Sequence, residues 1–100
     1  MRLSYRPAAI KDIESTANYI EYQLKNPSAA EKFKSAIVKK TALLKDNPEI
    51  GMKLSDKFDI DSDYRFIIIN KQIVFYEIHS QYIEIIRVLD GRTDYLTHLF

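Results

Sequence analysis

The sequence predicts a small α+β domain in which a helical half precedes an antiparallel sheet. Three observations carry this prediction. Apolar residues recur every three or four positions in the first half, which is the period of an amphipathic helix. The last third contains three runs rich in β-branched and aromatic residues, joined by two-residue links. The length, 100 residues, is that of one domain, so we expect residues 1–100 to form a single unit.

The composition of the chain argues against several classes of protein. Hydrophobic residues make up 46% of the chain, charged residues 29%, and the net charge is +1, so no strong overall field favours nucleic acid or a membrane surface. The chain has no cysteine, which excludes disulfides and thiolate metal ligands. It also has no apolar run of the roughly 20 residues that a membrane helix needs, and its N-terminus lacks the apolar core of a secretory signal. We therefore expect a cytoplasmic protein.

The first elements are an edge strand and a helix. Arg2 to Arg6 predicts a short N-terminal edge strand, and Pro7 is tolerated only in the first turn of the helix that follows, because it lacks an N–H. One apolar stripe then predicts about four helical turns. Asn26-Pro27 is expected to end the helix. The stripe consists of Ile10, Ile13, Ala17, Ile20 and Leu24.

A second helix is predicted after this break. Ser28 and Glu31 have the spacing of a capping box, in which each side chain accepts a hydrogen bond from the other residue's backbone N–H. Asn47-Pro48 is expected to stop the helix, and the short link makes the two helices an antiparallel hairpin. The inner face of the second helix is predicted to carry Ala30, Phe33, Ile37 and Leu44.

The sheet half begins after a polar connector, Gly51 to Asp63. Mixed β-branched, aromatic and polar residues favour antiparallel strands over buried parallel ones. The links Asn70-Lys71 and Ser80-Gln81 are short enough for hairpins. An apolar C-terminal turn, from Tyr95 to Phe100, is expected to pack on the core. The three-stranded meander is predicted over Tyr64–Ile69, Gln72–His79 and Tyr82–Leu89.

Several polar positions have structural interpretations. Gly91 is expected in a turn that requires positive φ. Arg87 is expected to form a structural ion pair, with Glu77 or Glu84 as candidate partners. Arg65 either pairs with the aspartates of the connector or contacts a phosphate or a partner. The two histidines, His79 and His98, have no third ligand at metal spacing in the sequence, so no metal site and no cofactor are expected.

The layout as a whole resembles the RelE/ParE superfamily. Members commonly open the first meander strand with Tyr-Arg, as Tyr64-Arg65 does here. They also carry an aliphatic-Arg-aliphatic run leading to His-Gly-Arg-Arg-Asp-Tyr, which the segment from Ile85 to Tyr95 resembles. Gly91, Arg92, Asp94 and Tyr95 match this pattern, whereas Asp90 replaces the histidine and Thr93 replaces the second arginine.

This resemblance implies the toxin of a bacterial type II toxin–antitoxin system, a growth inhibitor of the kind associated with plasmid stabilisation, with a cognate antitoxin as partner. ParE-like members poison DNA gyrase and are not enzymes, whereas RelE-like members cut mRNA on the ribosome. A toxin-like protein that only binds antitoxin is a third possibility. The resemblance makes Arg65, Arg92 and Tyr95 the candidate target-binding residues, and the same three are the catalytic candidates if the chain is an endoribonuclease.

The distribution of charge favours the ParE-like interpretation. Residues 1–50 carry nine Lys/Arg and six Asp/Glu, a net charge of +3. Residues 51–100 carry six Lys/Arg and eight Asp/Glu, a net charge of −2. Because RNA binding depends on basic residues that displace counterions from phosphates, an acidic sheet half argues against a nuclease. Asp90, where a histidine is usual, would also repel phosphate.

Overall fold

The computed structural model describes residues 1–100. Its five strands form one sheet in the order β1-β5-β4-β3-β2. None of the helices is both long and apolar enough to cross a membrane. Along the chain, the elements are β1 (Arg2–Tyr5), α1 (Pro7–Asn18), a π-helical turn (Tyr19–Gln23), α2 (Pro27–Ala42), two 3-10 turns (Leu43–Lys45 and Pro48–Ile50), β2 (Met52–Lys53), α3 (Leu54–Lys57), β3 (Arg65–Ile69), β4 (Gln72–Ile78), β5 (Tyr82–Asp90) and α4 (Tyr95–Leu99).

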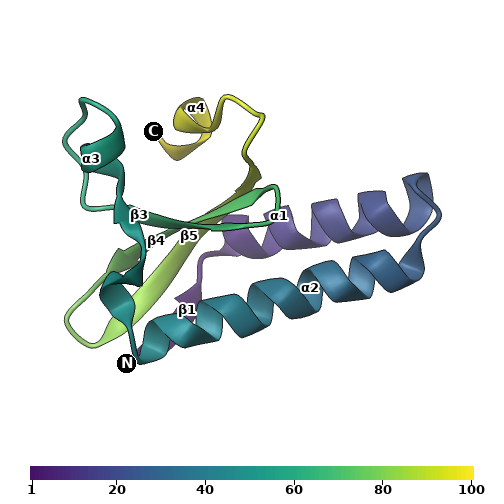
Figure 1. Cartoon of the computed structure of the whole chain (residues 1–100), viewed down its shortest axis with the longest axis horizontal. Helices are drawn as coiled ribbons and strands as arrows, with labels where there is room; N and C mark the ends of the chain where they lie inside the picture. The colour runs from purple at the N-terminus through teal and green to yellow at the C-terminus, as the bar shows by residue number, and fades with distance from the viewer.

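The sheet separates two layers. The α1–α2 hairpin covers one face, while α3 and α4 lie on the other side (Figure 1). Strand β1 pairs in parallel with β5 at one edge, and the remaining neighbours are antiparallel. The predicted α+β fold, with its edge strand, helical hairpin, meander and apolar C-terminal turn, is confirmed.

The core between the hairpin and the sheet follows the predicted inner face of α2. Ala30, Ile37 and Leu44 are fully buried there, and Phe33 is half-buried against the same cluster. Thr41 is also fully buried, although the sequence did not predict this because its side chain is polar. Its hydroxyl donates to the Ile37 carbonyl at 2.7 Å and lies 2.6 Å from the Tyr5 hydroxyl, so its polar atom is satisfied.

Two details of the hairpin differ from the prediction. Ile10 and Leu24 are 44% and 56% exposed, whereas Ala9 and Ala17 are buried. The hairpin extends beyond the sheet, so Leu24 near its tip has no strands beneath it (Figure 1). Ile10 instead lines an open groove between α1 and α2. The capping box does not form either, because Asn26 is the N-cap and its side chain accepts from Ala29 N at 3.1 Å.

The connector predicted as polar is part of the fold. Residues 52–53 add the fifth strand, β2, and α3 follows it immediately. Leu54 is fully buried in a second apolar cluster on the face opposite the hairpin. Phe58 and Ile60 pack against the same cluster, so this segment covers the sheet instead of merely linking two halves.

The C-terminal turn completes this second layer. Tyr95 packs on Phe75 with ring centroids 5.4 Å apart and on Phe58 at 6.1 Å. Leu96 and Leu99 contact the same cluster. Phe100 stacks on Tyr64 at 5.7 Å but remains 70% exposed. The prediction that the apolar tail packs on the core is therefore confirmed for α4, with Phe100 contributing least.

A β-bulge in β5 determines the position of Arg87. Phe75 faces Arg87 across the sheet, but the next residue, Tyr76, faces Ile85, so Ile86 has no partner. The bulge breaks the alternation of side chains, and Ile86 and Val88 join the clusters on opposite faces. Arg87 accordingly pairs with neither predicted glutamate.

Arg87 instead forms a bidentate ion pair with Asp12 of α1, at 2.7 and 2.8 Å. Asp12 also accepts from the backbone N–H of Val88 at 3.0 Å, on the part of β5 that β1 does not reach. The hydrogen bonds to Asp12 raise the pKa of Arg87. Arg87 donates a further bond to the His98 carbonyl at 3.2 Å. Arg87 thus joins α1, the bulged strand and α4. The predicted structural ion pair is present, but its partner is Asp12 and not a glutamate.

Gly91 does not occupy the predicted positive-φ position. No glycine has positive φ; Lys25 (φ 52°) and Asn70 (φ 57°) do. Asn70 supplies the left-handed residue of the β3–β4 hairpin, a conformation that asparagine tolerates. Gly91 N donates to the Lys71 carbonyl at 2.8 Å, and its backbone needs no glycine.

Gly51 is the glycine that the fold requires. Its backbone is extended, but a Cβ there would lie 2.5 Å from the Tyr76 hydroxyl and 2.7 Å from the Phe66 carbonyl oxygen. Tyr76 is fully buried, donates to the Pro48 carbonyl at 2.7 Å and accepts from Gly51 N at 2.9 Å. Burial raises the pKa of this phenol. Gly51 thus lets the chain approach a rigid, hydrogen-bonded tyrosine.

Gly51→Ala is expected to destabilise the fold by about 1–3 kcal/mol, the usual cost of overpacking. Denaturant unfolding checks this. Gly91→Ala is the matched control, because its Cβ would meet nothing closer than Ile73 Cδ1 at 3.4 Å and should change stability by less than about 0.5 kcal/mol. Equal stability of the two variants would mean that the contact at Gly51 is absent in solution.

Candidate target-binding surface

Arg92 is presented in the turn after the last strand. Its side chain is 76% exposed and forms a bidentate ion pair with the carboxylate of Asp90. The distances are 3.0 Å between Nε and Oδ1 and 2.8 Å between Nη2 and Oδ2. The Arg92 backbone N–H also donates to Asp90 Oδ1 at 2.8 Å. These bonds lower the pKa of Asp90 to about 2 and raise that of Arg92. Asp90 therefore stays charged near neutral pH and holds the guanidinium in one orientation.

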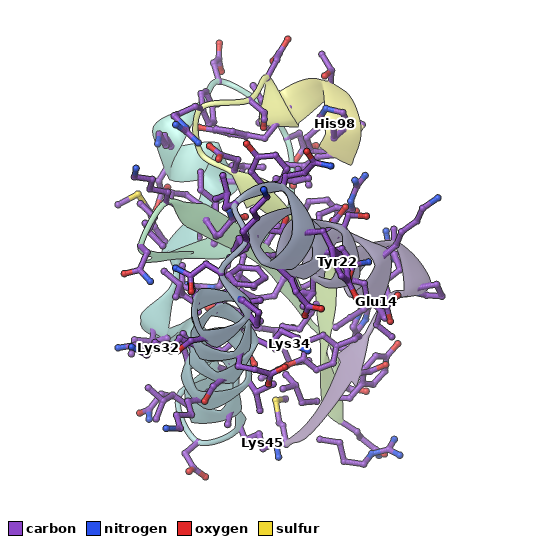
Figure 2. All side chains as sticks on the ribbon, turned by 90° about the vertical axis from the view of Figure 1, so that its right-hand side faces the viewer. Glu14, Tyr22, Lys32, Lys34, Lys45 and His98 are labelled. Atoms are coloured by element: carbon purple, nitrogen blue, oxygen red, sulfur yellow. The ribbon has the colours of Figure 1, made fainter.

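Two exposed groups, Lys71 and Tyr19, lie near the pair formed by Asp90 and Arg92. Lys71, in the β3–β4 turn, lies close enough to contribute to the lowered pKa of Asp90, and Tyr19 contributes slightly to the raised pKa of Arg92. Tyr19 belongs to the π-helical turn at the end of α1 and is 56% exposed. Tyr22, from the same turn, is 67% exposed and is labelled in Figure 2. Arginine and tyrosine are the residue types that dominate protein interfaces energetically.

Arg65 lies in a separate polar cleft. Its guanidinium donates to the carbonyl oxygens of Gly51 at 2.8 Å and Glu49 at 3.4 Å. It makes no ion pair with the aspartates of the connector, so that expectation is wrong; backbone carbonyls hold it instead. The cleft, of about 540 Å³, is lined by Lys53, Ser55, Asp61, Ser62, Asp63, Arg65, Glu77, Ile78 and His79.

The charges in this cleft disfavour phosphate. Two basic side chains, Lys53 and Arg65, face three carboxylates: Asp61, Asp63 and Glu77. With His79 neutral, the lining carries a net charge of −1. The sequence did not suggest that His79 belongs to this cleft, because the residues that surround it come from three separate segments.

Tyr95 is a packing residue in this structure. It is half-buried between Phe75 and Phe58, and no hydrogen bond involves its hydroxyl. No hydrogen bond links it to either of the two candidate arginines.

The three candidate residues therefore do not form one site. Arg65 is the first residue of β3, whereas Arg92 follows the end of β5, which pairs through Gln72 with the last residue of β3. The two arginines lie at opposite ends of the sheet, roughly 13 Å or more apart along the strands.

A third feature is an apolar groove on the hairpin. It has a volume of about 280 Å³ and lies between α1 and α2, next to β1. Ile10 and Val38, 44% and 61% exposed, are its most open apolar residues. Glu14 and Lys34, both labelled in Figure 2, are its charged lining residues. The outer edge of β1 is also unpaired, because β1 bonds only to β5.

The layered arrangement defines a toxin fold of the RelE/ParE type. Ten chains of solved structures match this one. One comes from a structure titled "Chromosomal ParDE TA system from P. aeruginosa", with a TM-score of 0.75 and 17% sequence identity over 90% of this chain and 95% of that chain. A family model described as "ParE toxin of type II toxin-antitoxin system, parDE" matches residues 3–95. The chain belongs to this ParE toxin family. The search of curated proteins gives no match.

Proposed function

We propose that this protein arrests bacterial growth by inhibiting DNA gyrase in the cytoplasm and that a cognate antitoxin neutralises it. Membership of the ParE toxin family supports the toxin–antitoxin part. The observation that favours gyrase over mRNA is the dispersal of the three nuclease candidates. RNA cleavage needs a base, an acid and cations around one phosphate. Here Arg65 and Arg92 lie at opposite ends of the sheet and Tyr95 is packed among aromatic rings.

The surface around Arg92 is the proposed contact with the target. Its guanidinium is exposed and preoriented by Asp90, so little side-chain entropy is lost when it binds a carboxylate. Tyr19 adds exposed aromatic area near this cation. Arg65, tied to two backbone carbonyls, is assigned a supporting role at the opposite end of the sheet.

The antitoxin is proposed to bind the groove between α1 and α2 and the open edge of β1. A flexible segment could place apolar side chains against Ile10 and Val38 and add a strand to β1. This surface lies on the hairpin and the first strand, apart from the turn that carries Arg92. A variant at Arg92 should therefore separate target binding from antitoxin binding.

A ribosome-dependent endoribonuclease is the second candidate. The observation that favours it is the cleft at Arg65, which gathers a histidine, a glutamate and two basic side chains. Against it stands the net negative lining, which weakens phosphate binding. Codon-positioned mRNA cuts that disappear in Arg65→Ala would support this function over the first.

Growth of a bacterial host tests the proposed function directly. Expression of the chain alone from a tightly regulated promoter should stop colony formation. Co-expression of the antitoxin encoded beside it should restore growth, because the proposed role of the antitoxin is to neutralise the toxin. Unimpaired growth at high levels of folded toxin would leave only antitoxin binding as its activity.

A further inference from the structure

We propose that Glu77, His79 and Glu84 form a binding site for a divalent transition-metal ion such as Zn²⁺. His79 Nε2 lies 3.3 Å from Glu77 Oε1 and 3.2 Å from Glu84 Oε1, and the three atoms lie within 4.8 Å of one another. Two ligands at 2.0–2.1 Å from zinc in tetrahedral geometry are about 3.3–3.4 Å apart. The histidine therefore already has metal-ligand spacing to both carboxylates.

The sheet register brings these groups together. Glu77 of β4 and Glu84 of β5 are direct cross-strand partners, and His79 lies just beyond the end of β4. Like charges directly opposite each other destabilise an antiparallel pair, so a cation between them is stabilising. The spacing of these residues in the sequence concealed the cluster, because Glu84 returns to it only through the β4–β5 hairpin.

Neighbouring groups fix the ligands in place. The His79 ring stacks on Tyr82 with centroids 4.4 Å apart, and His79 N donates to the Tyr82 carbonyl at 2.8 Å. Arg6 contacts both oxygens of Glu84, at 3.2 and 3.3 Å, and lowers the pKa of that carboxyl. Such outer contacts orient metal ligands and keep carboxylates ionised.

The net charge of the cluster favours the binding of a cation. Arg6 compensates one of the two carboxylates, which leaves a net charge of −1 when His79 is neutral. The only ion-pair partner of Glu77 is His79. Glu77 and His79 also line the cleft described above, which can supply water or a further oxygen ligand such as Asp61 or Asp63. One imidazole with carboxylate oxygens suits zinc and its first-row neighbours better than magnesium or calcium.

Titration of the purified, chelator-treated full chain with Zn²⁺ alone tests this proposal. Calorimetry should give one zinc ion per chain, and the melting temperature should rise by about 4 °C or more at saturating zinc. Glu77→Gln, which keeps the shape of the side chain, and His79→Ala should each weaken binding at least tenfold. His98→Ala is the matched control, because His98 is exposed on α4, outside the cluster (Figure 2).

Absence of stoichiometric binding to the wild-type chain would overturn the proposal and leave His79 as a bridge between two carboxylates. Binding that persists unchanged in Glu77→Gln and His79→Ala, or that disappears in His98→Ala, would also overturn it. The far-ultraviolet circular dichroism of each metal-free variant should match that of the wild type. If His79→Ala fails this check, Glu77→Gln decides the result.

Discussion

Arg92→Ala is expected to abolish growth arrest while leaving the protein folded and able to bind antitoxin. Arg92 is 76% exposed, and its partner Asp90 remains in contact with the backbone N–H of residue 92 after the substitution. The fold therefore loses little. At an interface, by contrast, truncation of a central arginine typically weakens binding about 30-fold or more. Colony formation, a thermal melt and antitoxin pull-down measure the three properties separately.

Two further variants sharpen this experiment. Arg92→Lys keeps the charge but loses the planar fork, so it should restore toxicity only in part. Arg2→Ala removes an exposed arginine on β1, far from the turn that carries Arg92, and should remain fully toxic. A folded Arg92→Ala protein with full toxicity would return Arg92 to a purely structural role.

Asp12→Ala is expected to destabilise the protein by about 2–3 kcal/mol. Asp12 and Arg87 have side chains only 13% and 23% exposed, and the substitution leaves the guanidinium with no ion-pair partner and only its hydrogen bond to the His98 carbonyl. Removing one partner from a fully buried pair costs about 3–5 kcal/mol, and partial exposure reduces that figure. The Val88 N–H also loses its acceptor at the open part of β5. Urea unfolding measures the change.

The control for Asp12→Ala is Glu14→Ala, on the same helix. Glu14 is exposed and makes no ion pair, so its loss should change stability by less than about 0.5 kcal/mol. A double-mutant cycle with Arg87→Ala isolates the pair itself. A coupling energy near zero would show that Asp12 stabilises the protein through its hydrogen bond to the Val88 N–H and not through Arg87.

The sequence predicted the order of the larger elements well because each has a clear composition or period. Helix α2 repeats apolar residues at helical spacing, the meander strands are rich in β-branched and aromatic residues, and their boundaries in the structure differ from the prediction by only a few residues. Strand β2 has two residues, and Leu54 is a single apolar position among polar ones, so neither gives a periodic signal. The bulge at Ile86 shifted the expected partner of Arg87 to Asp12, 75 residues away.

The candidate site was harder to predict than the fold. The motif placed Arg65, Arg92 and Tyr95 in one group, but a meander of three strands puts the start of the first and the end of the third at opposite ends of the sheet. The apolar pattern of the tail predicted that Tyr95 packs on the core, whereas the resemblance made it a site residue. Its ring contacts with Phe58 and Phe75 place it in the core. The cluster around His79 depends on cross-strand register, which no local pattern contains.

Gyrase supercoiling with purified components tests the central claim most directly. Relaxed plasmid, gyrase and ATP are incubated with the toxin, with the toxin–antitoxin complex, or with Arg92→Ala, and a parallel translation reaction is examined for cut mRNA. We expect the free toxin to block supercoiling, the complex and Arg92→Ala to leave it unaffected, and the mRNA to stay intact. Full supercoiling at saturating toxin, together with codon-positioned mRNA cuts, would contradict this account.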